Sequence, residues 1–311
     1  MQPVSGLADE HAVRDCAPVL LSEDEATQWI SDETAIVIWL GSAEEGPLHA
    51  AADTQDGQTP GFFALDLSHL PEPPVLGQHG RWAPLRATRG PGGDEEAVIG
   101  GRGVRLRSDD EVALLACARG MASWHHSVRF CAACGGKTEP CRHGRNRRCV
   151  DCGTRYRPRL DPSVIVLVTR GDKCLLGRKR EWPAGRYSTL AGFVEFGETL
   201  EECVLREMEE EAGVRCRRET IRFVGSQPWL FPRSLMVGYI IEAEDGELDV
   251  DEAELEDARW FEKAYVREQL ALQGDSDAPL EPGGFHVPSS ISLARNILEA
   301  WLGEDGIQRS S

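Results

Sequence analysis

The sequence predicts a multidomain protein of mixed α+β or α/β class, with a small cysteine-rich module between two larger domains. Three observations lead to this prediction. The chain has 311 residues, which exceeds the size of one average domain. Four cysteines occur at metal-ligand spacing near the middle of the chain. Beyond them, apolar runs typical of strands precede and follow a helical pattern. The predicted boundaries are 1–126, 127–157 and 158–311.

The N-terminal domain is expected to combine strands with one helix. Residues 35–40 form an apolar, β-branched run that ends at a glycine, and residues 61–67 form a second strand candidate. Residues 109–126 predict a helix, because acidic residues open an amphipathic pattern. Nothing catalytic stands out in this domain. We therefore expect it to serve as a scaffold or a dimerisation surface.

The C-terminal domain begins with a buried strand. Residues 163–169 are continuously apolar and β-branched, as expected of a strand covered on both faces. A closing amphipathic helix is predicted over residues 290–302. Between them lie further predicted strands at 173–177, 234–241 and 259–261, and a helix at 198–212. This alternation predicts an α/β domain.

Charge and hydropathy exclude several classes of protein. The net charge is −18, which argues against a surface that coats nucleic acid, although divalent cations could neutralise a nucleotide pocket. The sequence has no apolar run of about 18 residues, so no membrane span is expected. The first residues lack the basic start and apolar core of a signal peptide. We expect a cytoplasmic protein without a disulfide framework.

Two CxxC pairs predict a structural zinc site. Cys131 and Cys134 are separated by fourteen residues from Cys149 and Cys152. Two such knuckles form a tetrahedral Cys₄ ribbon, in which no coordination position stays open for catalysis. A redox role is the alternative, but the pairs lack a thioredoxin-like context. The other cysteines are scattered and are expected to be small core residues or inert thiols.

A glutamate-rich helix carries the strongest signal for chemistry. Thr199 and Glu202 form a capping box that starts the helix, and Gly213 is suited to end it. Glu207, Glu210 and Glu211 lie at i, i+3 and i+4 and therefore share a face. Crowded carboxylates repel one another, and hard divalent cations such as Mg²⁺ or Mn²⁺ relieve this repulsion. A solvated acidic helix face is the alternative interpretation.

The spacing around this helix resembles the Nudix hydrolase superfamily. The Nudix box requires a set of fixed positions, and all of them agree: Gly192, Glu198, Arg206, Glu207, Met208, Glu210, Glu211, Gly213 and Val214. The resemblance implies an α/β/α sandwich with a mixed sheet. It also implies that Glu207 and Glu211 bind metal and that Glu210 is a ligand or the general base. Arg206 orients a carboxylate, and the remaining implied metal ligands are the Ala191 carbonyl and Glu254, with Glu256 as the competing choice.

A second motif resembles the NADH pyrophosphatase family, whose members include NAD-capped RNA hydrolases. It is the array Ser226, Gln227, Pro228, Trp229, Leu230, Phe231, Pro232, Arg233 and Ser234. Leu230 departs from the family, which has proline there, so one φ constraint is lost. Prolines and aromatic rings in an exposed loop suit the binding of a flat ligand. The resemblance further implies substrate contacts from Phe193, Ala294, Tyr156 and Arg157, the last two across a homodimer.

These features together predict a homodimeric NAD(H) diphosphatase. It would hydrolyse NADH or NAD⁺ to nicotinamide mononucleotide and AMP, using Mg²⁺ or Mn²⁺, and would remove NAD caps from RNA. The alternatives are a Nudix hydrolase of another nucleotide, such as ADP-ribose or a nucleoside triphosphate, and a non-catalytic nucleotide-binding regulator. The array at 226–234 argues against the first alternative, and the complete glutamate set argues against the second.

Overall fold

The computed structural model describes residues 14–16, 36–42, 61–66, 104–106, 109–229, 233–274, 281, 283–288 and 292–303. The chain forms two compact units. The N-terminal unit comprises residues 1–87, 98–159 and 230–232, and the C-terminal unit comprises residues 88–97, 160–229 and 233–311. Among the described helices, none is long and apolar enough to cross a membrane.

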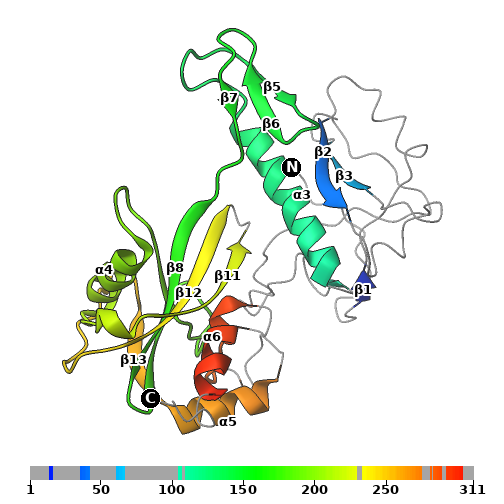
Figure 1. Cartoon of the computed structure of the whole chain (residues 1–311). Helices are drawn as coiled ribbons and strands as arrows, with labels where there is room; N and C mark the ends of the chain where they lie inside the picture. Colours follow the sequence, from blue (N-terminus) through cyan, green and yellow to red (C-terminus); the bar gives the residue numbers. More distant parts are fainter. Residues whose placement is uncertain are drawn as a thin grey trace. The chain divides into compact units, whose positions relative to one another are not determined.

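In the N-terminal unit, a long helix packs against short strands (Figure 1). The two predicted strands pair antiparallel with each other, and the predicted helix extends to Ser127. Ile38 is completely buried beneath this helix, so the apolar run supplies the core. The elements are β1 (Arg14–Cys16), β2 (Ile36–Ser42), β3 (Gly61–Asp66), β4 (Val104–Leu106) and α3 (Asp109–Ser127).

The cysteine-rich module folds within this same unit as three antiparallel strands, β5 (Thr138–Cys141), β6 (Asn146–Cys149) and β7 (Arg155–Tyr156). Arg147 donates from Nη1 to Nδ1 of His125 at 2.9 Å, so the other ring nitrogen carries the proton. That Nε2 donates to the Gly144 carbonyl at 2.7 Å. These buried hydrogen bonds fasten the module to α3.

The C-terminal unit is built on a six-stranded mixed sheet with the order β11-β12-β8-β9-β13, in which β10 also pairs with β8. The pairing of β12 with β8 is parallel and the others are antiparallel. The strands are β8 (Asp161–Arg170), β9 (Lys173–Arg178), β10 (Leu190–Phe193), β11 (Arg222–Trp229), β12 (Ser234–Glu242) and β13 (Asp257–Glu262).

Helices cover both faces of this sheet (Figure 1). Along β8, Val164, Val166 and Val168 face the core beneath α4 (Leu200–Ala212). The intervening Ile165 and Leu167 face the other core, which α5 (Lys263–Gln273) and α6 (Leu293–Leu302) cover. Burial on both faces explains why this strand is continuously apolar. The predicted α/β/α arrangement with a mixed sheet is confirmed.

Candidate active site

Helix α4 begins and ends as its sequence predicts. The Thr199 side chain accepts a hydrogen bond from the Glu202 amide, and the Glu202 carboxylate accepts one from the Thr199 amide. Gly213 ends the helix with φ 66°. Val204, Met208 and Ala212 are completely buried against the sheet. The packing of these three residues fixes the direction in which the glutamates on the rest of α4 point. The short η2 turn (Arg218–Thr220) follows the helix.

Glu207 lies directly against strand β10. A Cβ atom built on Gly192 would stand 1.7 Å from the Glu207 carboxyl carbon, so only glycine leaves room for that carboxylate. Ser163 donates a hydrogen bond from its hydroxyl to the Gly192 carbonyl at 2.8 Å. The strand is thereby held in place beneath Glu207. Ala191, the residue before Gly192 in this strand, is half-buried. Glycine at the first position of the box is therefore required because the Glu207 carboxylate lies so close to the backbone there.

Arg206 joins the acidic residues of the site. Its guanidinium donates to both oxygens of Glu198, at 2.7 and 2.8 Å, and this pairing lowers the pKa of Glu198 to about 2. The same group donates to Glu207 at 2.8 Å and to Glu210 at 2.9 Å. It also donates to the Phe193 carbonyl at 2.9 Å. The sequence predicted one carboxylate partner for Arg206. Its planar guanidinium group has five N–H donors and binds three carboxylates.

Glu211 is buried with an unsatisfied oxygen. The residue is 2% exposed, and its Oε2 atom has no hydrogen-bond partner among the residues that the structure describes. Burial raises its pKa to about 8, Lys179 opposes this shift, and Glu207 and Glu254 add to it. Burial also raises the pKa of Glu207. A buried carboxylate oxygen without a partner fits a position that a cation would share.

The causes of the pKa shifts of Glu207 and Glu211 distinguish Glu254 from Glu256. The charge of Glu254 raises the pKa of both Glu207 and Glu211, whereas Glu256 forms an ion pair with Arg178. The segment is held to the end of α4, because the Asp251 amide donates to the Glu211 carbonyl at 3.0 Å. The structure therefore brings Glu254 toward the acidic cluster and turns Glu256 to another partner. Glu210 is exposed beside them.

Two phenylalanines border the glutamate helix with open rings. Phe193 is 58% exposed, while its carbonyl is held by Arg206 and by the Cys203 thiol. Phe196 is fully exposed, and the two motifs did not predict a role for it. The sequence signal for it is an aromatic residue inside the box, three positions after Phe193. Both rings are free to contact a flat ligand.

The first four residues of the array at 226–234 lie in strand β11 and not in a loop, which corrects the expectation from its prolines. Pro228 is tolerated because β11 is an edge strand, which among the described strands pairs only with β12. Gln227 accepts a hydrogen bond from the Leu293 amide at 2.9 Å, which places the array beside Ala294 at the start of α6. Arg233 pairs with Asp161 at 3.0 Å, and Ser234 is buried. The predicted contacts Leu230, Phe231 and Pro232 lie outside the described residues.

Comparison with known proteins identifies the family. Residues 159–280 match the NUDIX domain family. The NAD-capped RNA hydrolase NudC of Pseudomonas aeruginosa is 35% identical over 279 residues, covering 88% of this chain and 86% of that protein. The protein of the same name from Mycobacterium tuberculosis is 39% identical over 251 residues, covering 76% of this chain and 78% of that protein. This chain belongs to the NudC family of NUDIX proteins. The family predicted from the two motifs is confirmed.

In this NudC-family chain the four cysteines converge on one point. Their sulfur atoms all lie within 4.8 Å of one another. The Cys131–Cys152 and Cys134–Cys149 sulfur pairs are 3.6 and 3.5 Å apart, close to the roughly 3.8 Å of a tetrahedral zinc–thiolate site. The Tyr156 hydroxyl donates to the Cys131 sulfur at 3.0 Å and lowers the pKa of Cys131 to about 6. Tyr156 thus supports the cysteine cluster, and Arg157 beside it is exposed.

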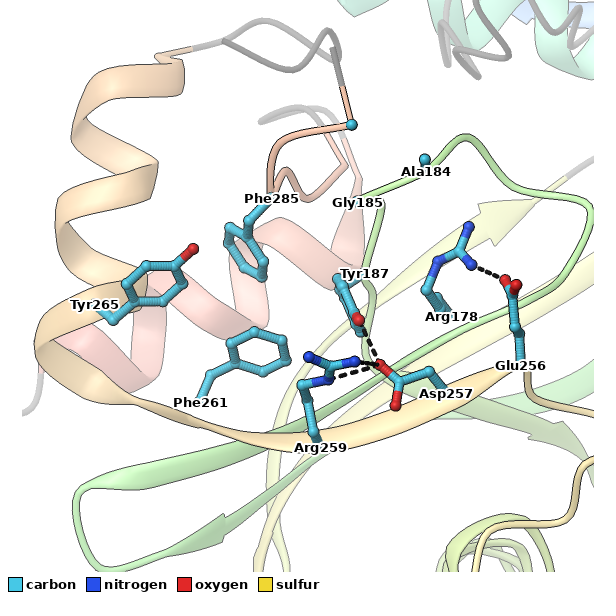
Figure 2. A pocket seen from close by; sticks show the side chains of 11 residues that line it. Arg178, Ala184, Gly185, Tyr187, Glu256, Asp257, Arg259, Phe261, Tyr265 and Phe285 are labelled. Atoms are coloured by element: carbon cyan, nitrogen blue, oxygen red, sulfur yellow. Dashed lines mark hydrogen bonds and ion pairs between the residues drawn. The ribbon is translucent and has the colours of Figure 1, made fainter. Parts of the chain in front are cut away.

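A cavity of about 570 Å³ lies elsewhere in the C-terminal unit, and Figure 2 shows its aromatic and charged lining. Tyr187 and Arg259 both donate to Asp257. On the other side of the cavity Arg178 pairs with Glu256. Its described lining includes no residue of the box and none of the described residues of the array, 226–229 and 233–234. Its charged groups are already paired, so this cavity does not carry the chemistry of the glutamate helix.

Proposed function

We propose that this chain is an NAD(H) diphosphatase that hydrolyses NADH and NAD⁺ to nicotinamide mononucleotide and AMP. The same cut would remove an NAD cap from RNA and leave a 5′-monophosphate. The relatives that bear the name NAD-capped RNA hydrolase support this proposal over most of their length. The observation that carries it is the buried, unpartnered Oε2 atom of Glu211 in the complete acidic cluster.

We propose that Glu207, Glu211 and Glu254, with the Ala191 carbonyl, hold catalytic Mg²⁺ or Mn²⁺, and that Glu210 is a further ligand or the general base. Oxygen ligands and the unsatisfied Glu211 atom fit such a cation. The bound metal would neutralise the diphosphate and lower the pKa of a bound water. Arg206 would keep Glu207 and Glu210 in position through the bonds described above. Glu210 is exposed and is therefore the candidate to accept the proton of the attacking water.

The substrate would lie between the glutamate helix and the array at 226–234. Phe193 would stack on a base through its open ring. Trp229 would add apolar surface, and Ser226 would offer a hydrogen bond. Gln227 would act indirectly by holding the start of α6, where the Ala294 backbone would contact the substrate. In a homodimer, Tyr156 and Arg157 of one subunit would complete the site of the other.

The cysteine cluster is proposed to hold structural Zn²⁺. All four ligand positions are filled by sulfur, which leaves no position for a substrate. The hydrogen bond from Tyr156 to Cys131 would stabilise the thiolate and fix its direction. The ion would therefore contribute to the folding of the N-terminal unit and not to hydrolysis.

The test incubates the full chain with NADH, ADP-ribose and NAD-capped RNA, with and without Mn²⁺, and identifies the products. We expect AMP from NADH only with the metal. Glu210→Gln should abolish turnover, whereas Glu209→Gln should retain it, because Glu209 pairs with Arg215 outside the acidic cluster. Cleavage of ADP-ribose alone would indicate another NUDIX substrate. No product from any substrate would support a non-catalytic binding protein and refute the proposal.

A further inference from the structure

The cysteine module has a charge opposite to that of the rest of the protein. Residues 127–159 contain nine Lys and Arg residues against two acidic ones, a net charge of +7. The whole chain has a net charge of −18, so the remainder carries −25. A single small module that concentrates positive charge in an acidic protein indicates a polyanionic partner for that module. The average charge of the chain conceals this feature.

The positive charge is available at the surface of the module. Arg147 is buried and is used to fasten the module to α3. The other eight cations are exposed: Arg129, Lys137, Arg142, Arg145, Arg148, Arg155, Arg157 and Arg159. Arg159 makes a further contact, and the other seven form no ion pair with any residue that the structure describes. Their charge is therefore not neutralised within the described parts of the chain.

Two of the arginines are placed directly opposite each other. In the register of β6 and β7, Arg148 faces Arg155. Like charges in this position destabilise a sheet, and Glu139 on β5 is the acidic neighbour of Arg148 on its other side. A bound phosphate would relieve the repulsion between the two guanidinium groups. Nothing in the packing of the module requires this pair, since both side chains are exposed.

An exposed aromatic residue accompanies the cations. Phe130 is 64% exposed and lies beside Lys137 in a β-bridge. Surfaces that bind single-stranded nucleic acid combine cations along the backbone path with aromatic rings on which bases stack. The combination therefore fits single-stranded RNA better than it fits a free dinucleotide, which carries only two phosphates.

We infer that the cysteine module binds the single-stranded RNA body of an NAD-capped transcript. The inference rests on the proposed function for the identity of the substrate. Along the sequence, a single residue, Leu160, separates Arg159 of the module from Asp161 at the start of β8. Within β8, Ser163 holds the box glycine Gly192 through its hydroxyl. The module would supply affinity through RNA phosphates, while the glutamate cluster would cut the cap.

The experiment compares three full-length variants with the wild-type protein. The test variant combines Arg142→Gln, Arg148→Gln and Arg155→Gln, which removes three cations without touching a cysteine or Tyr156. A charge-retaining variant carries Lys at the same three positions. The matched control combines Lys173→Gln, Arg217→Gln and Arg218→Gln, which are exposed cations of the C-terminal unit. Zinc content and melting temperature establish that each variant is folded.

The measurement is kcat/KM for NADH and for an NAD-capped 20-nucleotide single strand, each at 50 and 200 mM salt. Each phosphate contact to a single strand contributes about −0.7 to the logarithmic salt slope, so three contacts contribute about −2. For the capped RNA, we expect the fall in kcat/KM between the two salt concentrations to be roughly twentyfold smaller in the test variant. For NADH, we expect no change. The Lys variant and the matched control should behave like the wild type on both substrates.

Several outcomes would overturn the inference. An unchanged salt slope on capped RNA would do so, as would equal losses on NADH and RNA. A change in the sedimentation mass of the test variant with unchanged RNA decapping would assign the surface to a second copy of the chain. The proposed function fails separately, when the wild-type protein releases no AMP from NADH. In that case, fluorescence anisotropy with an uncapped single-stranded 20-mer still tests whether the module binds RNA.

Discussion

Gly192→Ala tests whether the close approach of Glu207 to strand β10 is needed for hydrolysis. The added Cβ would lie 1.7 Å from the carboxyl carbon of Glu207 and 2.0 and 2.1 Å from its oxygens. Ordinary contacts begin near 3.4 Å, so the carboxylate must move by about 1.7 Å. Either the Glu207 side chain swings away, or α4 moves off the sheet.

The size of the effect follows from what this movement breaks. The 2.8 Å bond from Arg206 to Glu207 would be lost, and a hydrogen bond between charged groups is worth about 1.5–3 kcal/mol. Overpacking a filled site costs about 1–3 kcal/mol. Since a displacement of about 1 Å in a catalytic group costs about 10²-fold in rate, we expect kcat/KM to fall at least that far. The melting temperature should fall as well.

The assay is AMP release from NADH over a range of Mn²⁺ concentrations, together with thermal unfolding. Gly246→Ala is the matched control, because a Cβ there meets nothing within 4 Å. It should leave both measurements unchanged. If Gly192→Ala showed wild-type kcat/KM and the same Mn²⁺ dependence, Glu207 would not need its observed position, and our assignment of the metal site would be wrong.

Three further predictions concern the same framework. Glu254→Gln should raise the Mn²⁺ concentration needed for half-maximal activity about 10–100-fold, whereas Glu256→Gln should leave that concentration within about twofold of the wild-type value. Equal effects of the two substitutions in a metal titration would contradict the choice of Glu254. Thr199→Ala should lower the free energy of unfolding by about 1 kcal/mol in urea, and an unchanged midpoint would refute the capping role. Removing zinc with a chelator should release one ion per chain and unfold the module around Cys131, as seen by faster proteolysis; no zinc in the untreated protein would refute the site.

Local signals predicted the helix of the site well. The capping box at Thr199 and Glu202 and the left-handed Gly213 involve residues only a few positions apart, so their sequence pattern contains the interaction itself. The same holds for the buried run of β8 and for the two CxxC pairs. Contacts between segments far apart in the sequence were harder to predict from sequence patterns. Residues 226–229 of β11 were expected to lie in a loop, because nothing in the prolines of the array shows that this strand lies at an edge.

The sequence by itself determined the chemistry of this protein: the carboxylates, their helical spacing, the cysteine pairs and the family. Tertiary structure decided which of those groups meet. Arg206 reaches Glu198 as well as two glutamates of its own helix, and Glu254 approaches the cluster while Glu256 turns to Arg178. The physical reason is that spacing along a chain specifies neighbours only within a turn or a strand. Burial and pairing between distant segments depend on how the sheet and helices pack.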